Sequence, residues 1–330
     1  MVMNIFSYSL KLVLAIALLA SIFSCSSDKD DGKTSLGYVS TGLTGLAVQI
    51  MKDNKIPEKY GLDLSYSGFP NPTSSNNSFV LGKYDINIAA GSNVVAVARS
   101  KGFDVTYFHP TLLNSVSLIV KRDSNYQKLK DLVGKKIGWY GLSSGGGTAF
   151  YLLGREEELS INDDFQLSQV SPPMLWPMLE KQEFDAIIIF EPFVSKMLST
   201  GEYRVILGPF WREWEKYHDA PMEMAGLAAS DSWLNENREI AMKMVKVWEE
   251  VVKIIKSDPK GLVSKYSELL GLKKESEIQM ASSNLPKLFV ERWGEMESSI
   301  ETTLKILQKD RVLIERPVQG VLTPIISETN

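Results

Sequence analysis

Short apolar runs alternate with longer amphipathic segments along the chain from Thr34 onward. Runs of strand length predict buried strands, and apolar residues at helical spacing after most of them predict helices. Strands are expected at residues 36–39, 62–66, 85–90, 105–108, 116–120, 166–170, 186–190, 204–207 and 223–229. Helices are expected at residues 46–55, 71–81, 94–101, 173–181 and 193–198. This alternation predicts parallel sheets covered by helices, with binding sites at the carboxyl ends of the strands.

The chain after Asp231 is predicted to be almost entirely helical. Asp231 or Ser232 is expected to cap a helix over residues 233–257. The apolar side chains of this helix fall on one face, which we expect to lie in the core. They are Met244, Val247, Trp248, Val251, Val252 and Ile255.

The most distinctive stretch is residues 135–153, where an apolar run is followed by a turn of small residues and then by a helical pattern. A glycine in a helix costs roughly 1 kcal/mol relative to alanine, so consecutive glycines at a helix start indicate a close approach to the backbone. Either a ligand or a tightly packed neighbour would explain them. Unpaired N–H groups and the helix dipole favour a small anion or polar head group. The residues expected to receive it are Ser143, Ser144, Gly145, Gly146, Gly147 and Thr148.

The same turn also permits a catalytic interpretation. Residues 141–145 match G-x-S-x-G, the nucleophile elbow of α/β-hydrolases, in a strand-turn-helix context. Ser143 would then need an acid such as Asp185 or Glu191, and the downstream His218. However, the sequence has no HGGG oxyanion segment, and the polar surroundings of His218 are typical of an exposed loop. We therefore expect Ser143 to donate a hydrogen bond to a ligand, and a secreted esterase is the alternative function.

The N-terminal residues predict export. Residues 1–24 carry one charged residue, Lys11, before an apolar run that is too short to span a membrane but suits a signal peptide. Cys25, the only cysteine, follows residues that resemble a bacterial lipobox. We expect it to be lipidated and to anchor the protein to a bacterial membrane, on the periplasmic or cell-surface side; a plain exported protein with a free thiol is the alternative. Residues 25–33 form the expected tether.

Composition narrows the choice of partners. The 330 residues are 44% hydrophobic and 23% charged, which is ordinary for a soluble chain of one large or two moderate domains. Without residues 1–24, the chain has 35 basic and 40 acidic residues, and its net charge is −5. It contains no basic run, so we expect no nucleic-acid partner. It also lacks a histidine–carboxylate cluster and a P-loop lysine, so we expect no metal and no cofactor.

Three groups of motifs together resemble one known family. They are LGKYDI at 81–86 with AAG at 89–91 and AVARSKG at 96–102; LKDLVGKKIG at 129–138 leading to SSGGGT at 143–148; and FDA at 184–186 with EP at 191–192. In this order the motifs resemble type II periplasmic substrate-binding proteins of ABC transporters, in the family that binds nitrate, sulfonates, taurine and thiamine precursors. The resemblance covers most of residues 36–230.

The resemblance implies an α/β fold of two Rossmann-like lobes joined by two crossover strands, with the C-terminal helices on lobe one. Lobe one would comprise residues 34–118 plus 222–330, and lobe two residues 119–221. A small anionic or aromatic, heterocyclic ligand would bind between the lobes, close them, and be delivered to an ABC transporter permease. The cysteine-rich motif of the family's thiamine-pyrimidine enzymes is absent, so we expect a binding protein that is not an enzyme, and a monomer.

The resemblance also implies ligand contacts at strand ends in both lobes. In lobe one the expected contacts are Ser40, Thr41, Gly42, Thr44, Ser92, Asn93 and Asn114. Four aromatic residues, Tyr38, Trp139, Tyr140 and Trp211, could line a pocket for a ring, although aromatic residues at strand ends more often belong to the core. Glu191 is expected to contact a ligand amine or hydroxyl, or to serve as a cap or a contact between lobes.

Overall fold

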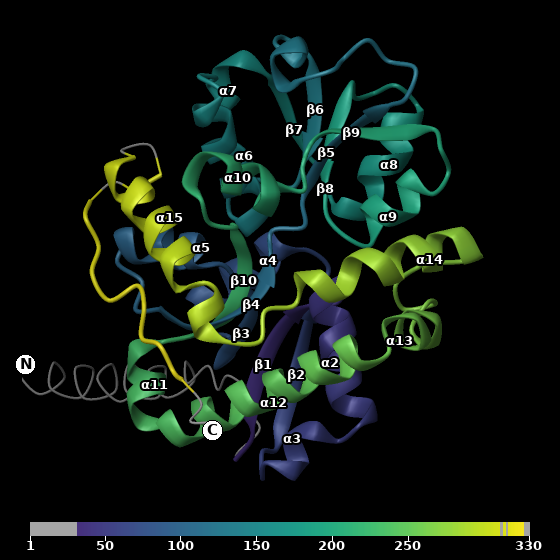
Figure 1. Ribbon diagram of the computed structural model, residues 1–330. Helices are drawn as coiled ribbons and strands as arrows, with labels where there is room; N and C mark the ends of the chain where they lie inside the picture. The colour runs from purple at the N-terminus through teal and green to yellow at the C-terminus, as the bar shows by residue number, and fades with distance from the viewer. Residues whose placement is uncertain (1–31, 311–312, 315, 327–330) are drawn as a thin grey trace, which may run out of the picture. The chain divides into compact units, whose positions relative to one another are not determined.

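The computed structural model describes residues 32–310, 313–314 and 316–326, and it contains two five-stranded sheets (Figure 1). The first has the order β2 (Leu64–Phe69), β1 (Thr34–Val39), β3 (Ile86–Ala90), β10 (Glu223–Ala229), β4 (Thr106–Leu113). The second has the order β7 (Gln166–Gln169), β6 (Lys136–Trp139), β8 (Ala186–Ile189), β5 (Ser117–Lys121), β9 (Tyr203–Leu207). In each sheet the strand that follows a crossover, β10 or β5, runs antiparallel to its neighbours. The sheets confirm the predicted two-lobed α/β architecture.

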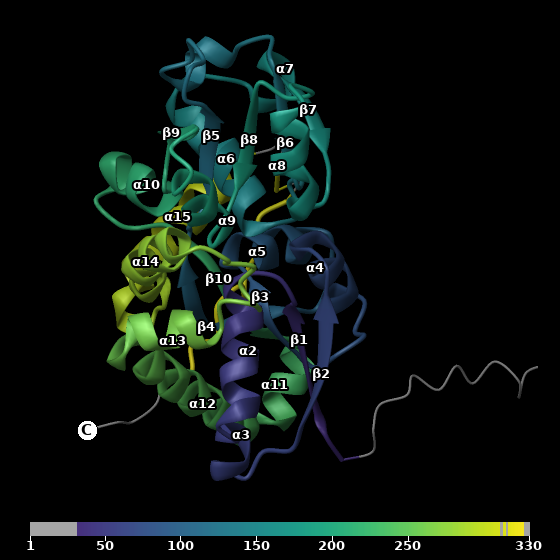
Figure 2. The same cartoon turned by 90° about the vertical axis from the view of Figure 1, so that its right-hand side faces the viewer.

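The first lobe surrounds the first sheet. Its helices are α2 (Leu43–Asp53), α3 (Ile56–Lys59), α4 (Pro72–Val80), α5 (Ser92–Ser100), α11 (Asp231–Glu236) and α12 (Arg238–Ser257). Helices α2 and α12 pack against each other and bury their apolar faces on the sheet (Figure 2). Every side chain of α12 that was predicted to lie in the core is buried, which confirms that prediction.

The second lobe surrounds the second sheet. Its helical elements are the 3-10 turn η1 (Leu129–Leu132), α6 (Gly145–Glu156), α7 (Ile161–Asp164), α8 (Pro172–Glu180), α9 (Phe193–Leu198) and α10 (Phe210–His218). The C-terminal part adds α13 (Pro259–Lys265), α14 (Glu275–Asn284), the 3-10 turns η2 (Leu285–Leu288) and η3 (Trp293–Glu295), and α15 (Glu297–Lys309). Helix α14 packs against α9 of the second lobe, whereas α15 packs against α5 of the first. None of the helices in the described ranges is both long enough and apolar enough to cross a membrane.

Three sequence predictions differ from the structure. The crossover into the second sheet lies at residues 114–116, so Ser117 and Leu118 belong to the second sheet and not to lobe one. The segment around His218, whose polar surroundings predicted an exposed loop, forms α10 (Phe210–His218) because Phe210 and Trp214 occupy one buried helical face. The helix predicted over residues 233–257 is interrupted at Asn237 and divided into α11 and α12. The predicted signal peptide, the lipidation site at Cys25 and the tether up to residue 31 lie outside the described residues.

The last described residues run along the edge of the first sheet beside β4. The Tyr107 N–H donates to the Val321 carbonyl at 2.8 Å, and the Thr323 N–H donates to the Tyr107 carbonyl at 2.9 Å. Because β4 is an edge strand, these bonds cover polar backbone groups that would otherwise be open to pairing with another chain.

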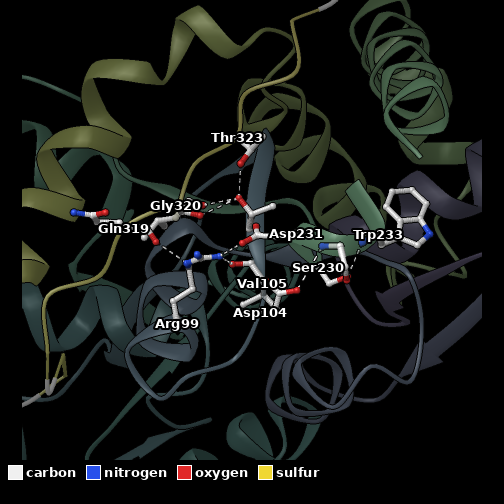
Figure 3. A network of polar contacts seen from close by, with 12 residues as sticks. Arg99, Asp104, Val105, Ser230, Asp231, Trp233, Gln319, Gly320 and Thr323 are labelled. Carbon is white, nitrogen blue, oxygen red and sulfur yellow. Dashed lines mark hydrogen bonds and ion pairs between the residues drawn. The ribbon is translucent and has the colours of Figure 1, made fainter. Parts of the chain in front are cut away.

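Arg99 of α5 connects this C-terminal segment to two other elements (Figure 3). Its Nε donates to the Gln319 carbonyl at 2.7 Å, while its Nη1 donates to the Val105 carbonyl at 2.9 Å and to the Asp231 carboxylate at 2.7 Å. One guanidinium group therefore connects α5, the start of β4, α11 and the C-terminal segment.

We expect Arg99→Ala to lower the free energy of unfolding by about 2 kcal/mol, because it leaves two carbonyls and a half-buried carboxylate without their donor. Chemical denaturation of the purified protein measures this loss. Lys243→Ala, which removes a helical ion pair to the exposed Glu239, is the control, and we expect it to leave the free energy of unfolding nearly unchanged. Equal losses in the two variants would contradict the bridging role of Arg99.

Candidate functional site

A pocket of about 50 Å³, here called the cleft pocket, lies between the two lobes. From the first lobe it is lined by Val39, Thr41, Leu43, Thr44, Pro72, Ala89, Leu112, Met224 and Ala225. From the second lobe it is lined by Tyr140, Ser144, Gly145, Gly146, Phe190 and Glu191. The ends of β1 and β3 therefore face the ends of β6 and β8, as expected for a site at the carboxyl ends of strands.

Two hydroxyl groups of the cleft pocket are buried without a protein partner. They are Thr41 Oγ1 on the β1–α2 turn and the Tyr140 hydroxyl directly after β6. Burial raises the pKa of Tyr140, so its hydroxyl stays protonated and can donate a hydrogen bond. A buried polar group without a partner costs stability, so one donor from each lobe is available to a bound molecule at little further desolvation cost.

Other hydroxyls predicted to bind the ligand are engaged within their own loops. Ser144 Oγ donates to the Gly141 carbonyl at 2.8 Å and accepts from the Gly147 N–H at 3.0 Å, so it caps α6. Thr148 Oγ1 donates to the Leu142 carbonyl at 2.9 Å, and Thr44 Oγ1 donates to the Val39 carbonyl at 3.0 Å. These hydroxyls shape the two turns that form the cleft pocket.

The three consecutive glycines at the start of α6 are approached closely by protein atoms. A Cβ at Gly145 would lie 2.2 Å from the Met224 carbonyl of the first lobe. At Gly146 it would lie 2.3 Å from the Tyr140 hydroxyl, and at Gly147 it would lie 1.9 Å from the Gly141 carbonyl. Of the two explanations for these glycines, close packing against neighbours therefore applies at all three positions, although Gly145 and Gly146 also line the cleft pocket.

A row of hydrogen bonds, here called the interlobe seam, joins the first lobe to the loop that follows β6. Four first-lobe side chains donate to backbone carbonyls at 2.9–3.4 Å: Thr73 to Tyr140, Asn76 to Ser143, and both Asn93 and Asn114 to Gly145. Asn93 and Asn114, predicted to be ligand contacts, thus contact the opposite lobe. The seam stabilises the arrangement in which the cleft pocket is enclosed.

Glu223 is a buried carboxylate beside the seam. Its Oε1 accepts a hydrogen bond of 2.6 Å from the Ser92 N–H at the first turn of α5, where the N-cap residue is Gly91 and has no side chain to contribute. Its Oε2 is buried without a partner. Burial raises the pKa of Glu223 to about 7, and the contact with Ser92 offsets only part of that rise.

The remaining predicted contacts lie in other surroundings. Tyr38 is half-buried with Lys52 Nζ 5.7 Å from its ring centre, and Ser40 Oγ donates to the Phe69 carbonyl at 2.8 Å. Gly42 is the N-cap of α2 and adopts a φ of 81°, in the left-handed region that favours glycine. Trp139 is buried in the core of the second lobe.

Glu191 lines the cleft pocket, but neighbouring side chains engage its carboxylate, and Trp211 does not line that pocket. Ser195 donates to the Glu191 carboxylate through its N–H and its hydroxyl, each at 3.0 Å, and Asn284 Nδ2 donates to it at 3.3 Å. Because Asn284 ends α14, Glu191 contacts the C-terminal helices, which agrees with the lobe-contact interpretation of this residue.

Sequence reasoning did not identify most of the apolar lining. Phe190 ends one predicted strand and Ala89 is the last residue but one of another, so the rule that sites lie at strand ends could have found them. Pro72 and Met224 gave no such signal, because only the packing of α4 and β10 against the opposite lobe brings them to the cleft pocket.

The hydrolase alternative is not supported. Ser143 is exposed, and no histidine in the described chain hydrogen-bonds to it. The ring of His218 lies on α10, where its Nε2 contacts Glu156 at 3.0 Å and the ring packs against Trp214 at a tilt of 39°. Ser143 therefore lacks a general base, and its role as a hydrogen-bond donor to a ligand stays a prediction.

Residues 58–261 match a protein-family model described as NMT1/THI5 like, and the match covers more than half of the chain. The chain belongs to the NMT1/THI5-like family. No curated protein sequence matched it. The resemblance to this family, which the sequence motifs indicated, is therefore confirmed.

Three solved structures similar to this NMT1/THI5-like protein are periplasmic binding proteins. The alkanesulfonate-binding protein SsuA from Xanthomonas axonopodis pv. citri, bound to MOPS, is 16% identical with a TM-score of 0.71, covering 89% of this chain and 98% of its own. The aliphatic sulphonate binding protein SsuA from Escherichia coli is 16% identical with a TM-score of 0.67, covering 87% and 95%. The nitrate-binding protein NrtA from Synechocystis PCC 6803 is 15% identical with a TM-score of 0.57, covering 76% and 70%. These similarities confirm the periplasmic-binding-protein fold.

Proposed function

We propose that this NMT1/THI5-like protein is an extracytoplasmic solute-binding protein that captures a small molecule between its lobes and delivers it to the permease of an ABC importer. The observation that carries the proposal is the cleft pocket, which is enclosed by both lobes and holds one unpartnered hydroxyl from each. A ligand that bonds to Thr41 and Tyr140 together stabilises the closed arrangement, because those contacts exist only when the lobes meet. The similar structures support this role through their fold.

The size and lining of the cleft pocket favour a small oxyanion. A water molecule needs about 10–15 Å³ of such a cavity, so about 50 Å³ accepts a ligand of about four heavy atoms, such as nitrate or bicarbonate, or the head group of a short sulfonate. No lysine, arginine or histidine lines it within the described chain, so recognition relies on neutral donors. A pyrimidine or flavin ring would require the lobes to be farther apart.

A thermal-shift screen tests the function directly. The panel comprises nitrate, bicarbonate, methanesulfonate and taurine, with a pyrimidine and riboflavin as the larger alternatives. A ligand at one hundred times its dissociation constant stabilises the folded state by about 2.7 kcal/mol, which raises the melting temperature by several degrees. We expect a shift with at least one small oxyanion. A shift with riboflavin alone would contradict the assignment of the ligand class.

Tyr140→Phe tests the role of the unpartnered hydroxyl in the cleft pocket. We expect it to weaken binding of the oxyanion found in the screen by about tenfold, because it removes one donor to a charged ligand. The fold should be unchanged, since this hydroxyl has no protein partner to lose. Titration calorimetry measures the affinity, and Tyr217→Phe, at an exposed tyrosine on α10, is the matched control. Unchanged affinity in Tyr140→Phe would place the ligand elsewhere.

We further propose that the protein is exported, lipidated at Cys25 and monomeric. A lipid at the first residue of the mature chain would hold the solute-binding lobes near the permease by the tether of residues 25–33. Cys25→Ser should move the protein from the membrane fraction to the soluble exported fraction and abolish labelling with palmitate, whereas Ser27→Ala should change neither. Palmitate labelling that persists in Cys25→Ser would contradict the anchor.

A further inference from the structure

A second cavity of about 230 Å³ lies behind the end of β8, between the second lobe and the C-terminal segment. Its lining comprises Ser115, Ser117, Glu191, Val194, Leu198, Val205, Pro209, Trp211, Arg212, Asn284, Lys287 and Leu288. We call it the rear cavity. Its volume is more than four times that of the cleft pocket and exceeds the roughly 150 Å³ of an engineered cavity that binds benzene.

The rear cavity has two cations at its rim and neither is neutralised. Arg212 and Lys287 are exposed, and in the described part of the chain neither forms an ion pair or a hydrogen bond with an acidic side chain. Arg212 lies over the Trp211 ring, with its guanidinium carbon 4.8 Å from the ring centre. The guanidinium group is therefore held beside the cavity by a planar surface.

The lining of the rear cavity contains both apolar and polar residues. Val194, Leu198 and Val205 form a wall that belongs to the second lobe. The carboxylate of Glu191, which also lines the cavity, already receives three hydrogen bonds, so its charge is largely satisfied by Ser195 and Asn284. The Ser117 hydroxyl has no hydrogen-bond partner among the described residues, although it lines the cavity.

From these observations we propose that the rear cavity is a second ligand site, for a compact organic anion with a carboxylate or sulfonate head and an aromatic or branched apolar body. The head group contacts Arg212 and Lys287, and the body packs against Trp211 and the apolar wall. Two cations that line one cavity without forming an ion pair favour an anion, and the volume admits a six-membered ring with a head group.

The position of the rear cavity links its ligand to the lobes. Its apolar wall comes from the second lobe, whereas Lys287 and Leu288 lie on η2, which Leu285 and Leu288 anchor in the core of the first lobe. A bound anion therefore contacts both sides and stabilises the arrangement in which they meet. The second site does not depend on the identity of the ligand in the cleft pocket.

Titration calorimetry of the intact protein with benzoate and with benzenesulfonate tests the proposal. Benzamide, which has the same ring without the charge, is the ligand control. We expect at least one of the two anions to bind, and Arg212→Gln and Lys287→Gln each to weaken it by about tenfold. Lys83→Gln, at an exposed lysine distant from the cavity, should leave the affinity unchanged, as should Tyr140→Phe in the cleft pocket.

Each alternative result overturns the proposal in a distinct way. No heat of binding with either anion at millimolar concentration excludes the site for this class of ligand. If benzamide binds as tightly as benzoate or benzenesulfonate, Arg212 and Lys287 do not recognise the charge of the ligand. Binding that is lost in Tyr140→Phe but kept in Arg212→Gln and Lys287→Gln assigns the anion to the cleft pocket, which would support the proposed function while removing the second site.

Discussion

Gly145→Ala is expected to weaken ligand binding about a hundredfold while leaving each lobe folded. The new Cβ would lie 2.2 Å from the Met224 carbonyl, which belongs to the opposite lobe, so the clash is relieved only when the lobes move apart. Opening breaks the seam bonds from Asn93 and Asn114 to the Gly145 carbonyl and separates Thr41 from Tyr140. Breaking two hydrogen bonds costs about 1 kcal/mol each, and losing the ligand contacts on one side adds to that cost. Together these losses correspond to an affinity about a hundredfold weaker.

A neighbouring glycine provides a contrasting variant. A Cβ at Gly147 would lie 1.9 Å from the Gly141 carbonyl of the same loop, so opening the lobes cannot relieve that clash. We therefore expect Gly147→Ala to lower the melting temperature, and Gly145→Ala to change mainly the affinity. Gly294→Ala, where no atom lies within 4 Å of the added carbon, controls for the substitution itself. If Gly145→Ala binds the ligand as tightly as the natural protein, ligand binding does not require the close approach of Gly145 to the Met224 carbonyl.

The alternating pattern was sufficient to predict sheets covered by helices, because buried strands and amphipathic helices produce distinct hydrophobic periodicities. The core face of α12 and the bounds of α9 were predicted correctly for this reason. The two-lobed arrangement was predicted from the family resemblance. The helix α10 was missed because its aromatic residues follow Gly208-Pro209, which is a typical turn signal, and its charged residues resemble a loop. The cap of α11 is Ser230 and not Asp231 or Ser232, a difference that depends on local backbone geometry.

The site was predicted less completely, for a physical reason. Strand-end turns can be located along the chain, and Thr41, Ser144 and Gly145 do line the cleft pocket. Whether a hydroxyl in such a turn faces a ligand or its own backbone is decided by the turn conformation, as Thr148 demonstrates. The seam and the hydrogen bond between Glu223 and Ser92 join residues that are far apart in sequence, so no local sequence pattern predicts them.

Glu223→Gln is expected to stabilise the protein by about 3 kcal/mol at pH 8 and to remove part of its pH dependence. The pKa of Glu223 rises from an ordinary 4.5 to about 7 in the folded protein. Between these values the folded state holds a proton that the unfolded state has lost, so stability falls as pH rises from about 4.5 to 7 and is constant above. A shift of this size corresponds to about 3 kcal/mol, since one pKa unit is about 1.4 kcal/mol.

Glutamine keeps the oxygen that accepts from the Ser92 N–H but never becomes charged, so the capping bond to α5 survives without the cost of a buried charge. Chemical denaturation at pH 5 and pH 8 measures the effect. Burial also raises the pKa of Glu191, which adds a slope of the same sign to both proteins, so the difference between the two slopes isolates Glu223. Parallel slopes would mean that Glu223 is ionised in the folded state at neutral pH. A flatter slope in the variant would show that the first lobe contains a carboxyl group kept neutral by burial, and that the folded state is favoured as pH falls.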